Sequence, residues 1–181
     1  MLKWFIRNRL AKFERRFDYD LSYAREILDA DLGAFLAFAR VQPMSKYRKD
    51  IPLDVLYAVK LVGTMAEDCG PCTQLMITMG LADGVDPKTL SAVVRGDEAM
   101  VSSDVRLGIA FARASLAHDP EAETHRDAII ARFGRRAVIA LAFALTLSRV
   151  YPTMKYALGY GKACQRVVVD GAAIPVIRAA A

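Results

Sequence analysis

Two cysteines stand close together in the stretch Glu67-Asp68-Cys69-Gly70-Pro71-Cys72. A pair of cysteines separated by two residues has three common interpretations: a redox-active dithiol, one half of a metal site, or two thiols that only fill space in the core. The residues near the pair, and the other potential ligands in the chain, decide how far each interpretation can be taken.

A zinc site is the least supported of the three. Structural zinc takes four ligands, and the other two usually come from a second Cys or His pair at short spacing. The remaining candidates, Cys164, His118 and His125, lie far from the pair in sequence and do not form a second pair. We therefore expect no metal and no other cofactor at this stretch.

The residues around the pair favour a redox dithiol. Pro71 suits the first turn of a helix, where its missing N–H is not needed. Cys69 would then lie beside the helix N-terminus, where the dipole and the free N–H groups stabilise a thiolate and lower the pKa of the thiol. Cys72 would follow one turn along the helix, within reach to form and resolve a disulfide.

Glu67 and Asp68 are the candidate acid–base groups for such a dithiol, since they directly precede Cys69. Acidic residues this close to a helix start also complement its dipole, so the residue types alone do not separate the two roles. Cysteine is also a common core residue, and structural thiols therefore stay open as an alternative to redox chemistry.

Composition places the chain among globular proteins. It has 181 residues, 54% of them hydrophobic and 25% charged, which is enough for one domain with its own core. The formal net charge is +5, but basic residues are spread among acidic ones without a nucleic-acid-binding signature, so we expect no nucleic-acid partner. Three cysteines without a secretory signal favour a reducing cytoplasm, where a dithiol can cycle.

Residues 1–20 form a basic amphipathic arm, in which apolar side chains from Leu2 to Phe17 alternate with Lys and Arg. Such a helix can lie on a membrane surface. We expect this one to pack on its own domain or, preferably, on a neighbouring subunit, without stable membrane insertion. Residues 21–181 follow as one all-helical domain.

Apolar residues at spacings of three and four predict a series of helices along this domain, and no series of strands. The fold expected is therefore all-α, a single helical domain of about seven or eight helices. The predicted helices are approximately 21–40, 52–66, 71–81, 87–95, 103–118, 121–133, 137–147 and 153–169.

The segment Ala137–Leu147 is the most apolar run of the chain. It is shorter than the roughly 20 residues that span a bilayer, so we expect it in the centre of the domain or at a subunit interface. The last predicted helix, 153–169, contains Cys164, which we expect to be a small buried side chain. The tail after Gly171 is short and apolar, and we expect it to be extended.

Two segments carry a resemblance to a known family. Thioredoxins also contain Cys-Gly-Pro-Cys, but after a strand, whereas helices surround it here. The strings Ala66-Glu-Asp-Cys-Gly-Pro-Cys-Thr-Gln-Leu75 and Arg149-Val-Tyr-Pro-Thr-Met-Lys-Tyr-Ala-Leu-Gly159 instead resemble an uncharacterised branch of the alkylhydroperoxidase D-like, or carboxymuconolactone decarboxylase, superfamily. Over residues 20–170, the resemblance implies an alkylhydroperoxidase D-like fold and an obligate homo-oligomer, often a trimer or hexamer. In the peroxidase members the dithiol reduces hydroperoxides; the sequence does not identify the reductant.

The chain departs from the motif of the peroxidase members at two positions. Those members have a Glu twelve residues before the first Cys and a His four residues after the second, whereas this chain has Tyr57 and Met76 there. The family's proton relay is therefore not carried over, and Glu67, Asp68 and Tyr57 are the remaining candidates. Met76 shares a helix face with Cys72 and is expected to fill the core.

The motif favours a thiol-dependent oxidoreductase that uses Cys69 and Cys72, and the resemblance implies hydroperoxides as its substrates. Which cysteine attacks is open; in the peroxidase relatives it is usually the second. The alternative is a non-enzymatic helical oligomer with structural cysteines. A decarboxylase-like lyase is less supported, because that branch relies on His and Arg, and both His here lie outside the matching motif.

Overall fold

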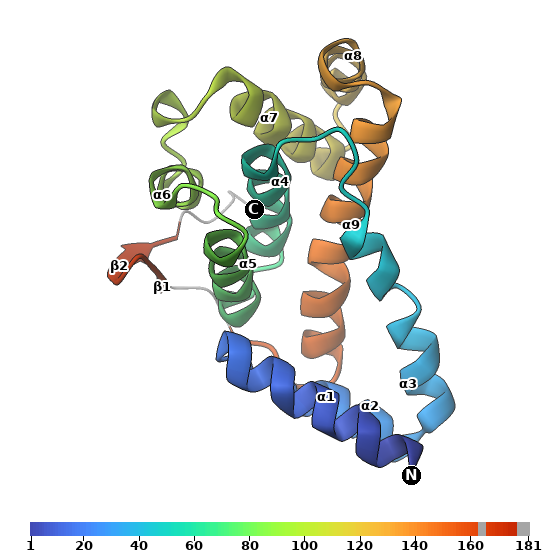
Figure 1. Ribbon diagram of the computed structural model, residues 1–181. Coiled ribbons are helices and arrows are strands. Elements are labelled where there is room, and N and C mark those ends of the chain that lie inside the picture. Colours follow the sequence, from blue (N-terminus) through green and yellow to red (C-terminus); the bar gives the residue numbers. More distant parts are fainter. Residues whose placement is uncertain (163–165, 177–181) are drawn as a thin grey trace.

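Helices make up most of the chain in the computed structural model, which describes residues 1–162 and 166–176 (Figure 1). The all-helical prediction is confirmed in its coarse form, since the described residues form nine α-helices, two 3₁₀-helices and one short hairpin. The α-helices are α1 Leu2–Phe17, α2 Ser22–Ala30, α3 Leu32–Ala39, α4 Leu53–Ala66, α5 Gly70–Ala82, α6 Pro87–Arg95, α7 Ser103–Ala117, α8 Glu121–Phe133 and α9 Arg135–Ala157. The 3₁₀-helices, η1 Gln42–Lys46 and η2 Glu98–Met100, lie in connections.

Helix α4 lies at the centre of the fold, in contact with α5, α7 and α9 (Figure 1). Every residue from Val55 to Thr64 is buried, as expected for a helix that is apolar on nearly all sides. The close approach of α9 depends on Gly63, where a Cβ atom would overlap Ser148 Oγ. The position of α4 matters for function because the cysteine pair follows directly after its C-terminal end.

Helix α9 is longer than predicted. It continues through Pro152, so the expected end near Leu147 and the separate helix after Pro152 were wrong. A proline inside a helix loses one backbone hydrogen bond, and the burial of the Pro152 ring offsets that loss. Length and composition alone would let the 23 residues of α9 cross a membrane. Its residues Ala140 and Leu141 lie in the main core, however, which confirms the predicted central position of the apolar run.

The predicted helix 21–40 is divided into two helices by Asp31. The backbone of Asp31 is extended, and its carboxylate accepts a hydrogen bond from Ala34 N at 2.7 Å, as the N-cap residue of α3. An aspartate at this position favours a new helix start over the continuation of the old helix. The spacing of the apolar residues continues across Asp31, so the hydrophobic pattern alone predicts one unbroken helix.

The end of the chain also differs from the prediction. Instead of a helix to Val169, Arg166–Val169 (β1) pairs antiparallel with Ala172–Pro175 (β2). The run of valines favours a strand, and Asp170 and Gly171, with φ of 47° and 77°, make the tight turn. Val168 N donates a hydrogen bond to Gln74 Oε1 at 2.7 Å, and Gln74 Nε2 donates to the Val168 carbonyl at 2.9 Å. These two bonds fix the hairpin on α5. Within the described part of the tail, Ala172–Pro175 is extended, as predicted, and Cys164 lies outside the described residues.

The N-terminal segment packs on its own chain. Side chains of α1 and α2 form a second apolar cluster, centred on Tyr19 and Tyr23 and separate from the main core around α4. Tyr151 and Met154 of α9 belong to this cluster, so α1 and α2 lie across the C-terminal part of α9 (Figure 1). Packing on its own domain was one of the two arrangements expected for the arm; contact with a neighbouring subunit stays a prediction.

Candidate active site

The cysteine pair lies in the tight connection between α4 and α5. Glu67 ends α4, Asp68 takes a left-handed conformation with φ 47°, and Cys69 is the N-cap residue of α5. The Cys69 carbonyl accepts hydrogen bonds from Thr73 N and Thr73 Oγ1 at 2.9 and 3.0 Å, which close the first turn of α5. Pro71 stands in that turn, as predicted, because its missing N–H is not needed there.

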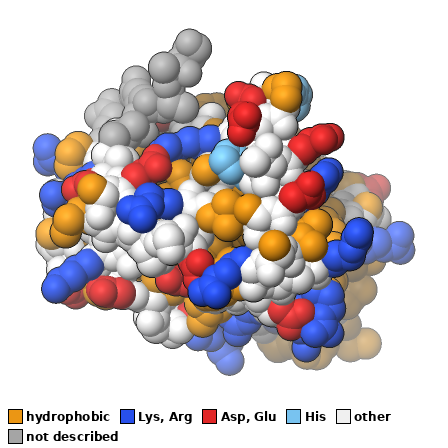
Figure 2. Space-filling view, turned by 90° about the horizontal axis from the view of Figure 1, so that it is seen from above, with side chains coloured by type: hydrophobic (Ala, Val, Ile, Leu, Met, Phe, Trp, Pro, Cys, Tyr) orange, Lys and Arg blue, Asp and Glu red, His pale blue; other side chains and the backbone are white. Residues whose placement is uncertain are grey.

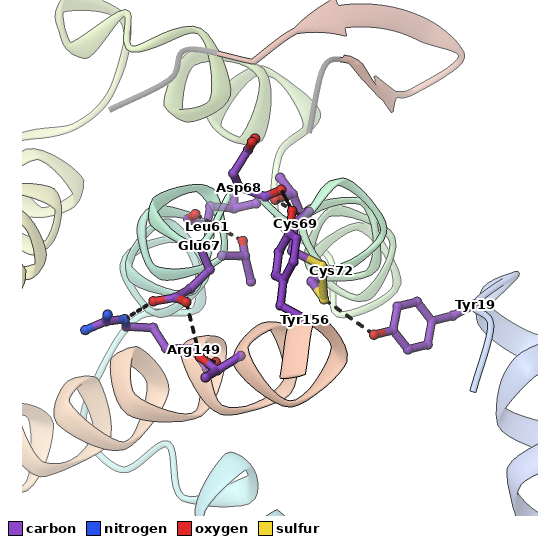
Figure 3. Close-up of a disulfide and its surroundings, with 11 residues drawn as sticks. Tyr19, Leu61, Glu67, Asp68, Cys69, Cys72, Arg149 and Tyr156 are labelled. Atoms are coloured by element: carbon purple, nitrogen blue, oxygen red, sulfur yellow. Dashed lines mark hydrogen bonds and ion pairs between the residues drawn. A yellow bond between two sulfur atoms is a disulfide. The ribbon is translucent and has the colours of Figure 1, made fainter. Parts of the chain in front are cut away.

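Cys69 and Cys72 are joined by a disulfide, with their Cα atoms 5.3 Å apart (Figure 3). The first turn of α5 thus brings the two sulfur atoms together, as the spacing predicts. Both residues are buried, with 0% and 3% of their surface exposed. The pair combines a helix N-terminus, which stabilises negative charge on sulfur, with an environment shielded from water.

Tyr19, from the turn between α1 and α2, places its hydroxyl 3.5 Å from Cys72 Sγ (Figure 3). A disulfide sulfur carries no hydrogen, so the tyrosine O–H is the donor in this contact. Burial raises the pKa of Tyr19 to about 12. Tyr19 therefore keeps its proton at neutral pH, and the same O–H can donate to a Cys72 thiolate when the disulfide is reduced.

Lys155 of α9 is a second group that the sequence did not reveal, and it packs on Tyr19, the residue that contacts Cys72. It is 3% exposed, and its ammonium lies 4.7 Å from the centroid of the Tyr19 ring and 5.6 Å from that of Tyr23. Burial lowers the pKa of Lys155, and the nearby Lys162 acts in the same direction, against the opposite effect of Asp20. The aromatic faces stabilise the cation where the described residues offer it no ion pair.

Glu67, a predicted acid–base residue, points toward α9 (Figure 3). Its carboxylate accepts hydrogen bonds from Arg149 Nε and, at 3.1 Å, from Thr153 Oγ1. These contacts fasten the end of α4 to α9 just before the cysteines. They give Glu67 a positioning role, and its part in proton transfer stays a prediction.

Asp68, the other predicted acid–base residue, contributes its backbone to the site. Its carbonyl accepts a hydrogen bond from the Tyr156 hydroxyl at 2.9 Å, and its side chain points away from the disulfide (Figure 3). Gly70 N donates to the Lys162 carbonyl at 3.0 Å, so the segment after α9 also holds the cysteine turn. Asp68 is therefore adjacent to the pair in sequence, but its carboxylate is not directed at the sulfur atoms.

Tyr57 and Met76 occupy the positions where peroxidase relatives would have Glu and His. The Tyr57 hydroxyl donates to Asp83 at 2.8 Å, at the opposite end of α5 from the cysteines. Burial raises the pKa of Tyr57, and the bond to Asp83 adds to the rise. Met76 packs against the main core, as predicted. Neither side chain replaces the missing relay, whereas Tyr19 touches the sulfur that such a relay would serve.

A groove of about 610 Å³ runs along α9 beside the end of α7. Its lining is mostly apolar and includes Leu116, Leu145, Val150 and Met154. Arg149 and Thr153 also line it, and these are the residues that hold Glu67. The groove therefore reaches the support of the cysteine turn, although the sulfur atoms themselves are covered.

Among the residues that the structure describes, no three His, Cys, Asp or Glu side chains gather as a metal site. His118 is the C-cap residue of α7 and His125 lies in α8, so neither belongs to the elements that form the cysteine turn. No protein-family model, curated protein or solved structure matches the chain in comparisons with known proteins. The case for a function therefore depends on the chemistry of the Cys69–Cys72 site.

Proposed function

We propose that the protein is a thiol-dependent oxidoreductase in which Cys69 and Cys72 cycle between dithiol and disulfide, with small hydroperoxides as the oxidising substrates. The observation that carries this proposal is the contact of the buried Tyr19 hydroxyl with Cys72 Sγ, in a disulfide at the start of α5. A cystine that only braces a fold has no need of a protonated hydroxyl directed at one sulfur.

In the proposed cycle Cys72 is the attacking thiol. Its thiolate attacks the terminal peroxide oxygen, the O–O bond breaks, and the departing alkoxide takes up a proton and leaves as an alcohol. Cys72 is then a sulfenic acid. The Cys69 thiol attacks that sulfur, the S–S bond forms and water leaves. Two electrons from an external thiol reductant return the disulfide to the dithiol.

Tyr19 and the helix N-terminus divide the work of activating the two thiols. Tyr19 donates to Cys72 and stabilises its thiolate, because a hydrogen bond to the charged form favours that form. Cys69, as the N-cap residue of α5, lies at the positive end of the helix dipole. Burial of both sulfurs restricts the attack to small peroxides, unless the turn that carries Tyr19 moves.

Single-cysteine variants test the assignment directly. Reduced wild-type protein should consume hydrogen peroxide repeatedly when a thiol reductant is supplied. Cys72→Ser should lose this activity, whereas Cys69→Ser should still react once and accumulate a sulfenic acid at Cys72. If the two variants exchange these behaviours, Cys69 is the attacking thiol; if peroxide leaves the wild-type thiols reduced, the oxidoreductase proposal fails.

A structural cystine in a non-enzymatic helical assembly is the second candidate, and the full burial of Cys69 favours it. The two functions differ in what the cysteines contribute. A structural cystine predicts that reduction or Cys69→Ala, Cys72→Ala lowers stability by up to about 2 kcal/mol, since the closed loop is short, and changes no activity. The homo-oligomer expected from the sequence belongs to both proposals, and sedimentation of the purified protein tests it. The reducing cytoplasm expected from the sequence fits the cycling dithiol.

A further inference from the structure

Helix α1 presents a basic and aromatic face to solvent. Its inner side chains, Leu10, Phe13 and Phe17, pack in the second cluster. The opposite side, here called the α1 outer face, consists of Leu2, Trp4, Phe5, Arg9, Lys12, Arg15 and Arg16, all exposed. Leu2, Trp4 and Phe5 are 52%, 60% and 57% exposed, although large apolar side chains are more usually covered.

The α1 outer face carries four cations and no acidic residue of its own. Glu14, the acidic residue of α1, is half-buried and bound to Arg25. Arg9, Lys12 and Arg15 make no hydrogen bond or ion pair within residues 1–162 and 166–176. The opposite end of the molecule is different, because acidic and basic side chains are interspersed there (Figure 2). Helix α1 itself carries six Lys and Arg residues and one Glu, so its charge is strongly positive.

A second apolar element, partly exposed, follows α2. Helix α3 has the sequence Leu-Gly-Ala-Phe-Leu-Ala-Phe-Ala; its Phe35 and Phe38 pack on the second cluster, and Leu36 is 42% exposed. Lys3 Nζ donates to the Asp29 carbonyl at 3.3 Å, and Arg7 pairs with the Asp29 carboxylate. The start of α1 therefore lies beside the end of α2, from which α3 begins (Figure 1). The start of α1, which carries Trp4 and Phe5 in the sequence, thus lies at the same end of the molecule as α3 (Figure 1).

We infer that the α1 outer face docks on the surface of a membrane that contains anionic phospholipids. The cations would pair with lipid phosphates, while Trp4 and Phe5 enter the region between head groups and acyl chains, as in amphipathic helices that lie on a bilayer. The arrangement fits a membrane better than a nucleic acid, because the aromatic residues gather at one end instead of alternating with the cations. Apolar α3 also adds surface that a bilayer covers and a nucleic acid does not. This inference is independent of the dithiol chemistry.

Trp4 is the only tryptophan in the chain, so its fluorescence reports directly on the docking face. The full-length protein is mixed with vesicles of phosphatidylcholine alone, or of phosphatidylcholine with phosphatidylglycerol, and binding is followed by flotation and Trp4 emission. The expected result is flotation and a blue shift with the anionic vesicles, both reduced by high salt. Neutral vesicles should leave the emission unchanged. Absence of binding to anionic vesicles at low salt overturns the inference.

Two sets of charge reversals distinguish binding by the α1 outer face from a general effect of the net charge of the protein. Arg9→Glu, Lys12→Glu and Arg15→Glu together should weaken binding to the anionic vesicles at least about tenfold. Lys88→Glu, Arg95→Glu and Arg135→Glu change the net charge equally on other exposed elements and should keep the affinity within about threefold. Circular dichroism checks that both variants remain helical. Equal losses in the two sets overturn the inference.

Two further outcomes would assign the face to a different partner. A blue shift of Trp4 that rises with protein concentration in the absence of vesicles would mean that a second copy of the chain covers the face. Tighter binding to an RNA or DNA oligonucleotide than to anionic vesicles would mean a nucleic-acid surface. Either result contradicts membrane docking, as would unchanged vesicle binding by Trp4→Ser, Phe5→Ser.

Discussion

The Tyr19 hydroxyl lies 3.5 Å from Cys72 Sγ, although 53 residues separate the two in sequence. The contact brings the turn between α1 and α2 onto the first turn of α5 and makes the N-terminal segment part of the site. It also distinguishes the two cysteines, because each meets a different stabilising group: the hydroxyl for Cys72 and the helix start for Cys69.

Removal of the Tyr19 hydroxyl should destabilise the thiolate form of Cys72 relative to the thiol. In a protein with Cys69→Ser and Cys164→Ser, Tyr19→Phe should raise the pKa of the Cys72 thiol by one to two units, since a hydrogen bond to a charged group contributes about 1.5–3 kcal/mol. The pH dependence of alkylation measures this pKa. Tyr57→Phe removes another buried hydroxyl, bound to Asp83 at the far end of α5, and should leave the pKa unchanged. Equal pKa values in all three proteins would rule out a role for Tyr19.

Lys155 should support the same thiolate through its charge. In the same background, Lys155→Met should raise the pKa of the Cys72 thiol on the order of half a unit to one unit, because the buried cation that packs on Tyr19 is lost. Lys60→Met is the matched control, since Lys60 is also buried and its ammonium lies 4.3 Å from the centroid of the Tyr57 ring. A shift of similar size in both variants would mean that the effect is not local to Cys72.

Glu67→Gln tests whether Glu67 positions the turn or transfers protons. Because its carboxylate is held by Arg149 and Thr153, we expect the substitution to loosen the tie to α9 and to change peroxide consumption less than about threefold. The pH–rate profile should keep its shape. Loss of one limb of that profile, with a rate at least about tenfold lower, would instead make Glu67 the relay that the sequence suggested.

The buried Lys60 predicts a pH-dependent stability. Burial lowers its pKa from 10.5 to about 8, so the unfolded chain binds this proton more tightly than the folded one. The charged Lys60 therefore lowers the free energy of unfolding at neutral pH. This loss of stability disappears as the pH rises from about 8 to 10.5. Lys60→Met should gain about 3 kcal/mol more stability over wild type at pH 7 than at pH 10.5. Urea unfolding measures the difference; the exposed Lys88→Met should show no such pH trend.

Local signals in the sequence predicted much of the helical framework. Asp119-Pro120 and Gly134 bound α8 as expected, and Ser102 caps α7. The sequence predicts a helix boundary at Pro152 because the lost hydrogen bond of a proline is a local effect. The burial that compensates this loss depends on the assembled core, which the local sequence does not show. The hairpin has a recognisable sequence signal, the Asp170-Gly171 turn after a run of valines. The prediction of a helix up to Val169 did not take this signal into account.

The site divides in the same way. Cys69, Pro71 and Cys72 were predicted because their chemistry depends on residues within one helical turn. Tyr19 and Lys155 reach the site from distant helices, and a single tyrosine or lysine has no sequence pattern that marks it as a neighbour of a cysteine. Only the folded arrangement of α1, α2 and α9 around the start of α5 reveals them.

The reduction potential of the Cys69–Cys72 pair, measured together with the loss of thiols after one equivalent of hydrogen peroxide, tests the redox proposal most directly. A cycling dithiol should have a potential at or above about −270 mV, as in thioredoxin, and should form one disulfide per peroxide consumed. A potential below about −300 mV, with thiols that survive the peroxide, is the behaviour of a structural cystine and would contradict the proposed function.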